Sequence, residues 1–130
     1  MYIIKGRGCP KFRTVKAVLD IKGVEYDVIE STIFSLKTNH TELSYIENII
    51  RYLDDRYPVP QLISGEIPHR AVLIELVHHI RKDPRIVEKL IAKADPFING
   101  KNICILDILA FVHTRNQPYR LFMSGVINAN

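Results

Sequence analysis

The sequence predicts an α/β fold in two parts: a βαβ-ββα half over residues 1–60 and a short all-helical half over residues 61–130. Two observations lead to this prediction. Near the amino terminus, a short apolar run, a turn, an amphipathic helical pattern and a second extended pattern follow in the order of a βαβ unit. Beyond residue 66, every element that the apolar spacing predicts is a helix.

The βαβ unit is predicted from residues that mark where its strands and helix begin and end. The run from Tyr2 to Ile4 predicts a buried strand, and Cys9-Pro10 marks the start of the helix that follows. Gly23 is placed to end that helix, and the extended pattern from Val24 to Ile29 predicts a strand parallel to the first. The apolar face of the helix is formed by Val15, Val18 and Leu19.

Residues 33–44 predict a cramped β-hairpin, and a clearer helix follows it. Ser44 and Glu47 have the spacing of a capping box, and the spacing of the isoleucines predicts one buried face. Asp54 and Asp55 are assigned to the opposite, solvated face. Pro58 and Pro60 end the helix and impose an extended conformation.

The boundary between the halves is predicted to lie in a linker, Gln61 to Glu66, with which the second half begins. Pro68 suits the first turn of one helix, and Asp83-Pro84 suits the N-cap and first position of the next. Residues 103–112 are almost wholly apolar, which predicts a central, buried helix. Residues 115–130 predict either a short terminal helix or a partly disordered tail.

Composition limits the classes of function. With 130 residues, 47% of them hydrophobic, the chain can bury one substantial core. The net charge of +4 favours acidic partners or nucleic acid only weakly. No apolar run approaches the roughly 20 residues of a membrane-spanning helix, and Cys9 and Cys104 fall in different predicted elements. We therefore expect a cytoplasmic protein without a disulfide framework, a metal or a cofactor.

The order of these motifs resembles the glutathione S-transferase fold, in which a thioredoxin-like half precedes a helical half. The resemblance rests on Cys9-Pro10, on Lys22-Gly23-Val24 with Tyr26, and on Leu106-Asp107 in an apolar helix. It implies that Asp107 caps the family's central helix, with Cys104 in place of the usual serine. It also implies a reduced thioredoxin-like half, because too few residues separate Ile29 from Ile33 for the family's second helix.

Within this fold, the chain is most similar to the stringent starvation protein A family, bacterial regulators that associate with RNA polymerase and lack transferase activity. The resemblance covers most of residues 1–115, and its specific matches lie within residues 52–62 and residues 70–83. In that family, a Pro-x-Pro segment faces RNA polymerase and its sigma factor. The resemblance therefore implies a partner-binding site made of Tyr57, Pro58, Val59, Pro60, Gln61 and Leu62.

The alternative is a glutathione-dependent enzyme, either a degenerate transferase or a monothiol oxidoreductase, that uses Cys9. A helix N-terminus favours the thiolate form of a cysteine. Phe12, however, stands where a Cys-x-x-Cys motif needs its second thiol. The positions that bind glutathione in the family correspond to Phe34, Tyr45 and Ile46, none of which is the expected residue.

The sequence thus predicts a non-enzymatic transcription regulator whose partners are RNA polymerase and its sigma factor, with DNA contacted only through the polymerase. Homodimers or heterodimers are common in the resembling family, so either is possible here. A third hypothesis is that the chain keeps the fold and has lost all activity.

Overall fold

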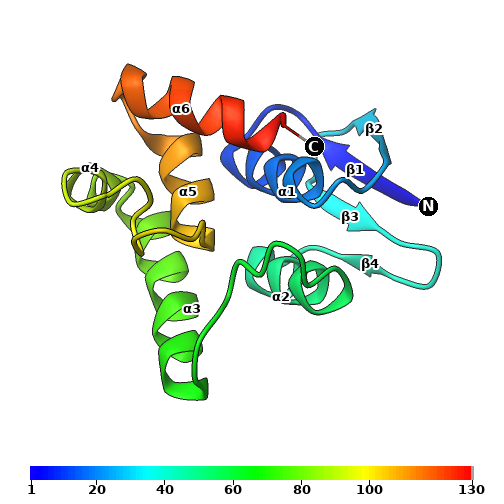
Figure 1. Ribbon diagram of the computed structural model, residues 1–130. Helices are drawn as coiled ribbons and strands as arrows, with labels where there is room; N and C mark the ends of the chain where they lie inside the picture. Colours follow the sequence, from blue (N-terminus) through cyan, green and yellow to red (C-terminus); the bar gives the residue numbers. More distant parts are fainter. Residues whose placement is uncertain (130) are drawn as a thin grey trace.

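A four-stranded sheet forms the first part of the molecule, with strand order β2-β1-β3-β4 (Figure 1). The structure is a computed structural model that describes residues 1–129. β1 pairs parallel with β2 and antiparallel with β3, and β3 pairs antiparallel with β4. The strands are β1 (Tyr2–Gly6), β2 (Tyr26–Glu30), β3 (Ser35–Lys37) and β4 (Glu42–Leu43). The predicted βαβ unit and hairpin are both confirmed.

Helix α1 (Pro10–Ile21) connects the two parallel strands. Cys9 is its N-cap and Pro10 its first residue, a position that needs no backbone N–H donor. Gly23 has a φ of +68°, the left-handed conformation in which glycine commonly ends a helix. The chain therefore turns back to start β2, as the sequence predicts.

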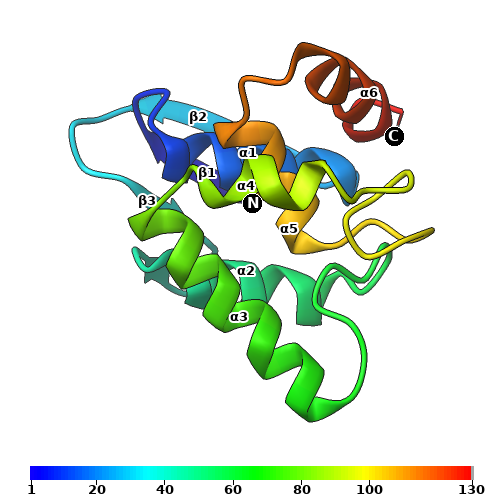
Figure 2. The same cartoon turned by 90° about the vertical axis from the view of Figure 1, so that its left-hand side faces the viewer.

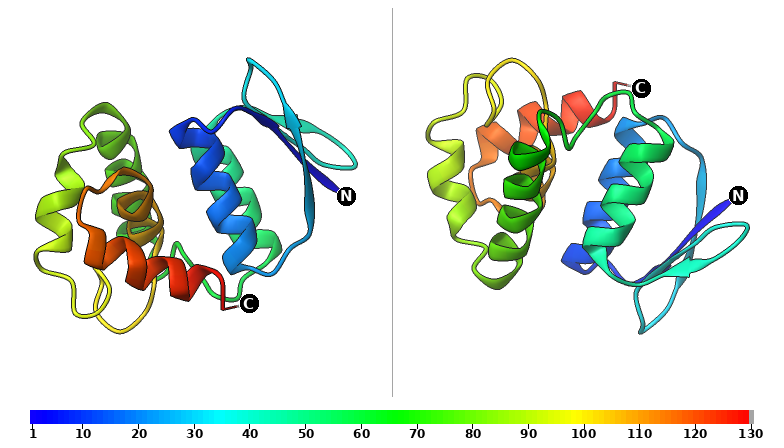
Figure 3. Two further views of the ribbon diagram at one scale, coloured as in Figure 1. Left: turned by 90° about the horizontal axis from the view of Figure 1, so that it is seen from above. Right: turned by 90° about the horizontal axis from the view of Figure 1, so that it is seen from below.

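Helices α1 and α2 (Ile46–Arg56) lie side by side against one face of the sheet (Figure 3). The segment between β2 and β3 contains no helix, so within residues 1–129 no helix covers the other face. That face carries polar pairs: Lys5 lies 3.5 Å from Glu42, and the Ser35 hydroxyl donates to Glu42 over 3.0 Å. A sheet with one solvated face needs such polar residues on it.

The predicted capping box of α2 is wrong. The helix begins at Ile46 with Tyr45 as its N-cap, and no side chain caps it. Ser44 therefore precedes the N-cap position and does not cap the helix. Glu47 instead accepts a 2.6 Å hydrogen bond from Arg81. The predicted apolar stripe is buried as expected and consists of Ile46, Ile49, Ile50 and Leu53.

Four helices form the second part: α3 (Ile67–Lys82), α4 (Ile86–Ile91), α5 (Ile105–His113) and α6 (Gln117–Ile127). Figure 2 shows α3 and α4 on the side of the molecule that faces away from the sheet. Helix α5 contacts α1, α3, α4 and α6, and its residues 105–110 are all buried. The prediction of a central helix is confirmed.

Asp107 stabilises the start of α5. Its carboxylate accepts hydrogen bonds from the backbone N–H groups of Cys104 at 3.0 Å and Ile98 at 2.9 Å. It also accepts the Tyr119 hydroxyl at 2.7 Å, which ties α6 to α5. The capping role that the resemblance implied for Asp107 is therefore present.

One other prediction in the second part needs correction. Helix α4 begins at Ile86 with Arg85 as N-cap, because Pro84 and Arg85 form a turn instead of the first helical residues. For the tail, the first of the two predicted alternatives is confirmed, because a terminal helix is present. Asn116 accepts the Tyr119 N–H at 3.0 Å and caps α6.

Buried apolar side chains from both parts form one hydrophobic cluster. The segment that the sequence assigns to a linker contributes to it, because Leu62 and Ile63 are 0% and 7% exposed. Within residues 1–129, no helix is both long enough and apolar enough to cross a membrane.

Candidate functional site

A buried ion pair holds the segment that follows α2. The Lys22 ammonium donates to Asp54 Oδ1 over 2.9 Å, and these two side chains are 0% and 5% exposed. The same ammonium donates to the backbone carbonyls of Tyr57 and, over 2.8 Å, Pro60. All three donors of the ammonium group are therefore used, as burial of a lysine requires.

Asp54 completes this arrangement from the other side. Its Oδ1 atom accepts the Leu62 N–H at 2.8 Å, and its Oδ2 atom accepts the Ile63 N–H at 3.0 Å. Both ends of the stretch from Tyr57 to Ile63 are consequently hydrogen-bonded to the buried Lys22–Asp54 ion pair. We call residues 57–61 the proline segment.

The prediction that Asp54 lies on a solvated face is wrong. Asp54 is four residues after Ile50, so it continues the buried stripe of α2 by one more turn. Its charge is tolerated there because Lys22 and two backbone amides surround it. The spacing from Ile50 was the available signal, but the sequence did not identify the partner in α1.

The six residues predicted for partner binding differ in exposure. Pro58, Val59 and Gln61 are exposed, and Val59 is 80% exposed. Leu62 is fully buried, so it supports the segment and cannot contact a partner directly. The exposed part is therefore shorter than predicted and centres on Pro58 and Val59.

Tyr57 fixes the start of the proline segment. Its hydroxyl donates to the Tyr2 hydroxyl over 2.9 Å, and the two rings meet edge to face with centroids 6.0 Å apart. The Arg56 guanidinium lies over the Tyr57 ring at 4.9 Å. Burial, followed by hydrogen bonds to Tyr52 and Tyr57, raises the pKa of Tyr2. This cluster anchors the segment to β1, and Tyr57 itself is half-buried.

The alternative site, Cys9, lies in a cleft of about 610 Å³ between the two parts of the molecule. Its sulfur accepts the Phe12 N–H over 3.4 Å at the start of α1. Basic side chains line the cleft together with apolar ones, and among the described residues no Asp or Glu does. The basic residues include Lys11, Arg81 and Lys82, and the apolar ones include Phe34, Ile46 and Leu109.

His113 also lines this cleft. Burial, and then the nearby Arg13 guanidinium, lowers the pKa of His113 below its ordinary value. Cys104 is separate from the cleft: it is 1% exposed, and burial raises the pKa of its thiol to about 12. Cys104 therefore behaves as a core residue, as predicted, and supplies no second thiol.

The positions compared with the family's glutathione-binding residues are distributed as follows. Phe34 precedes β3 and lines the cleft, Tyr45 is 73% exposed, and Ile46 is buried in α2. Within residues 1–129, the only cis peptide bonds are Val59-Pro60 and Asp95-Pro96, so the bond before β3 is trans. No group of three or more His, Cys, Asp or Glu side chains in that range is placed to hold a metal ion.

Comparison with solved structures identifies the fold. A glutathione transferase homologue from Burkholderia, solved with bound glutathione, matches with a TM-score of 0.70 and 19% identity over 99% of this chain and 91% of its own. The Tau class glutathione S-transferase of mango, Mangifera indica, matches with a TM-score of 0.74 and 15% identity over 99% and 89%.

A glutathione S-transferase from Rhodospirillum rubrum gives a TM-score of 0.73 and 15% identity over 100% of this chain and 89% of its own. No protein-family model matches the sequence, and no curated protein does. The chain therefore has the glutathione S-transferase fold, as its sequence predicts. Because the sequence identities do not exceed 19%, the comparison supports the fold alone.

Proposed function

We propose that this protein is a non-enzymatic binding factor that contacts RNA polymerase and its sigma factor through the proline segment. The observation that carries the proposal is the exposure of Pro58 and Val59 on a stretch whose two ends are held by the buried Lys22–Asp54 pair. A partner that binds there meets a surface that is already ordered.

Preorganisation gives this surface a physical advantage. Ordering the backbone of a flexible loop on binding costs about 1–2 kcal/mol for each residue that becomes fixed. Here the carbonyls of Tyr57 and Pro60 and the amides of Leu62 and Ile63 already have partners. Most of that cost is consequently met during folding.

The identity of the partner comes from the resemblance of residues 52–62 to the stringent starvation protein A family. In that family the corresponding Pro-x-Pro segment faces RNA polymerase. Val59 replaces the histidine that often stands between the prolines there, so an apolar contact takes the place of a polar one.

A pull-down of RNA polymerase from the native cell tests the proposal. We expect Val59→Asp and the double variant Pro58→Ala/Pro60→Ala to recover less polymerase than the wild type. Ile33→Asp is the matched control, because Ile33 is also an exposed aliphatic residue, at 73%, and lies in the loop between β2 and β3. Equal recovery with all of these proteins would exclude the proline segment as the contact.

Self-association belongs to the same proposal, because dimers are common in the resembling family. Sedimentation of the purified chain over a range of concentrations measures it directly. The polymerase test should use the oligomeric state found in this way.

A second candidate function is glutathione-dependent thiol chemistry at Cys9. The observation that favours it is the position of Cys9 at the helix start in a cleft lined by Lys11, Arg81 and Lys82. Cationic groups and a helix N-terminus both stabilise a thiolate. In the monothiol reaction, the Cys9 thiolate would attack the glutathione sulfur of a mixed disulfide and release the substrate as a thiolate. The thiolate of a second glutathione would then attack the glutathione sulfur of the Cys9 mixed disulfide, which releases glutathione disulfide and regenerates the Cys9 thiolate.

Retention on immobilised glutathione, together with the pH dependence of Cys9 alkylation, tests this candidate. The expected result is retention of the wild type and faster alkylation than a free thiol near neutral pH. Cys9→Ser is the control for alkylation. Absence of retention with ordinary alkylation kinetics would exclude it.

A further inference from the structure

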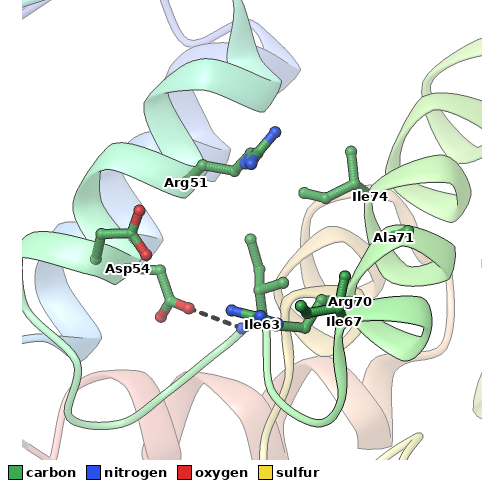
Figure 4. Close-up of a pocket in the computed structure, with 8 residues that line it drawn as sticks. Arg51, Asp54, Ile63, Ile67, Arg70, Ala71 and Ile74 are labelled. Carbon is green, nitrogen blue, oxygen red and sulfur yellow. Dashed lines mark hydrogen bonds between the residues drawn. The ribbon is translucent and has the colours of Figure 1, made fainter.

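A groove of about 450 Å³ separates α2 from the first turns of α3 (Figure 4). It is separate from the Cys9 cleft, and its lining includes the buried Ile63, two residues after the end of the proline segment. Neither the predicted binding residues nor the thiol chemistry uses it.

Two arginines reach this groove from different helices. Figure 4 shows Arg51 projecting from α2 into the space between the helices, and Arg70 projecting from α3 toward Ile63. Both residues are exposed, and among the described residues neither forms an ion pair with a carboxylate. Each guanidinium thus keeps its donors for a ligand.

The acidic residues at the groove do not cancel both arginines. The Asp54 carboxylate lines one wall but is already neutralised by Lys22 and bonded to Ile63. Asp55 is exposed, and its one negative charge can balance only one of the two arginine charges. The lining therefore keeps an excess of positive charge beside a neutralised carboxylate.

Aliphatic side chains lie between the arginines. Ile74 is half-buried on the wall formed by α3, and Ile67 is 71% exposed at the first position of that helix. A small inorganic anion would use the arginines but would leave these isoleucines exposed to water. A ligand that fits the whole groove needs an apolar group next to a negative one.

We propose that this groove binds a short acidic segment of a partner protein in which an aliphatic residue adjoins Asp or Glu. The carboxylates pair with Arg51 and Arg70, for which planar, two-point contact is the favoured geometry. The aliphatic side chain covers Ile67 and Ile74. This inference is independent of the polymerase proposal, because it uses a different set of residues.

Fluorescence anisotropy with a labelled peptide containing Leu-Asp-Glu-Leu provides the test, with the Leu-Asn-Gln-Leu peptide as the uncharged comparison. We expect saturable binding of the acidic peptide that weakens with added salt. The double variant Arg51→Gln/Arg70→Gln should weaken it about tenfold or more, since charge-assisted hydrogen bonds are lost.

Matched variants separate the groove from general electrostatics. Arg115→Gln removes an exposed arginine outside the groove and should leave the affinity for the peptide unchanged. Ile67→Ser alters no charge and should weaken binding if the apolar contact is real. Because Ile67 is 71% exposed, this change leaves the core intact.

Three results would overturn the inference. The first is absence of saturable binding to the wild type, and the second is equal affinity for the acidic and uncharged peptides. The third is a dimer in solution that Arg51→Gln/Arg70→Gln dissociates, because a second copy of this chain would then occupy the groove.

Discussion

Replacing Lys22 with methionine isolates the contribution of the buried ion pair. Methionine has nearly the length and shape of the lysine side chain, so the packing around α1 is largely kept. What disappears is the ammonium group that contacts Asp54 and the carbonyls of Tyr57 and Pro60. Asp54 then retains only two backbone donors in a site that is 5% exposed.

The expected cost follows from this environment. Removing one partner of a buried ion pair typically costs about 3–5 kcal/mol, because the remaining charge is left without compensation. A domain of this size is stable by about 5–15 kcal/mol in total. For a chain of this length, the change corresponds to a fall in melting temperature of about 10–20 °C.

Urea unfolding followed by circular dichroism measures the free energy of unfolding, and Lys16→Met is the matched control. Lys16 forms an exposed ion pair with Asp20 within the same helix, at 2.9 Å. Such pairs contribute about 0.5 kcal/mol or less. Amide hydrogen exchange at Leu62 and Ile63 gives a second readout, because both amides bond to Asp54.

A loss below about 1 kcal/mol for Lys22→Met, equal to that of the control, would refute the reasoning. The same conclusion would follow if the exchange of the Leu62 and Ile63 amides were unchanged. In that case the ion pair would not be what holds the proline segment, and the argument for a preorganised surface would fail with it.

Three further predictions concern single residues. Since burial raises the pKa of the Cys104 thiol to about 12, iodoacetamide at about pH 8 should label native protein once, at Cys9; mass spectrometry detecting two adducts would contradict this. Gly65→Ala should destabilise the protein by about 1–2 kcal/mol, because Gly65 has a φ of +96° and a Cβ there would lie 2.7 Å from a histidine ring. The control Gly125→Ala, at a helical position where a Cβ meets no other atom, should be neutral or stabilising. Equal urea midpoints for Gly65→Ala and Gly125→Ala would contradict the prediction. The pKa of His113, measured by NMR titration, should lie below its ordinary value of 6.5. Because the unfolded state then binds the proton more tightly, the free energy of unfolding should decrease as the pH falls below 6.5. His113→Gln should make the free energy of unfolding less dependent on pH in this range.

Local sequence signals were sufficient for most of the fold. Cys9-Pro10 and Gly23 mark the two ends of α1 because each residue type suits a backbone position that few others do. The apolar run before His113 predicts the central helix because a helix without a polar face has to be buried. These signals depend on a few neighbouring residues and need no knowledge of distant contacts.

The errors lie where distant residues determine the result. Glu47 has the spacing of a capping residue, yet it pairs with Arg81 from another helix. Asp54 was assigned to solvent because a carboxylate usually faces it, and its stabilising partner is 32 positions earlier in the sequence. Leu62 was counted as part of a contact surface because the resembling family has its partner-facing segment there, but in this chain it is buried in the core. Spacing along one element does not contain this information.

The hydrogen bonds of Asp54 also bear on attempts to divide the chain. A truncation after Pro60, at the boundary suggested by the sequence, would remove the Leu62 and Ile63 amides. Asp54 would keep the Lys22 ammonium at Oδ1 but lose the donor at Oδ2. The complementary fragment would keep the Leu62 carbonyl, which accepts the Ile105 N–H at 2.9 Å, but would lose the carboxylate that positions it. Neither fragment retains a complete set of bonds, so we expect the full chain to unfold in one cooperative transition and the excised pieces to be poorly folded when expressed alone.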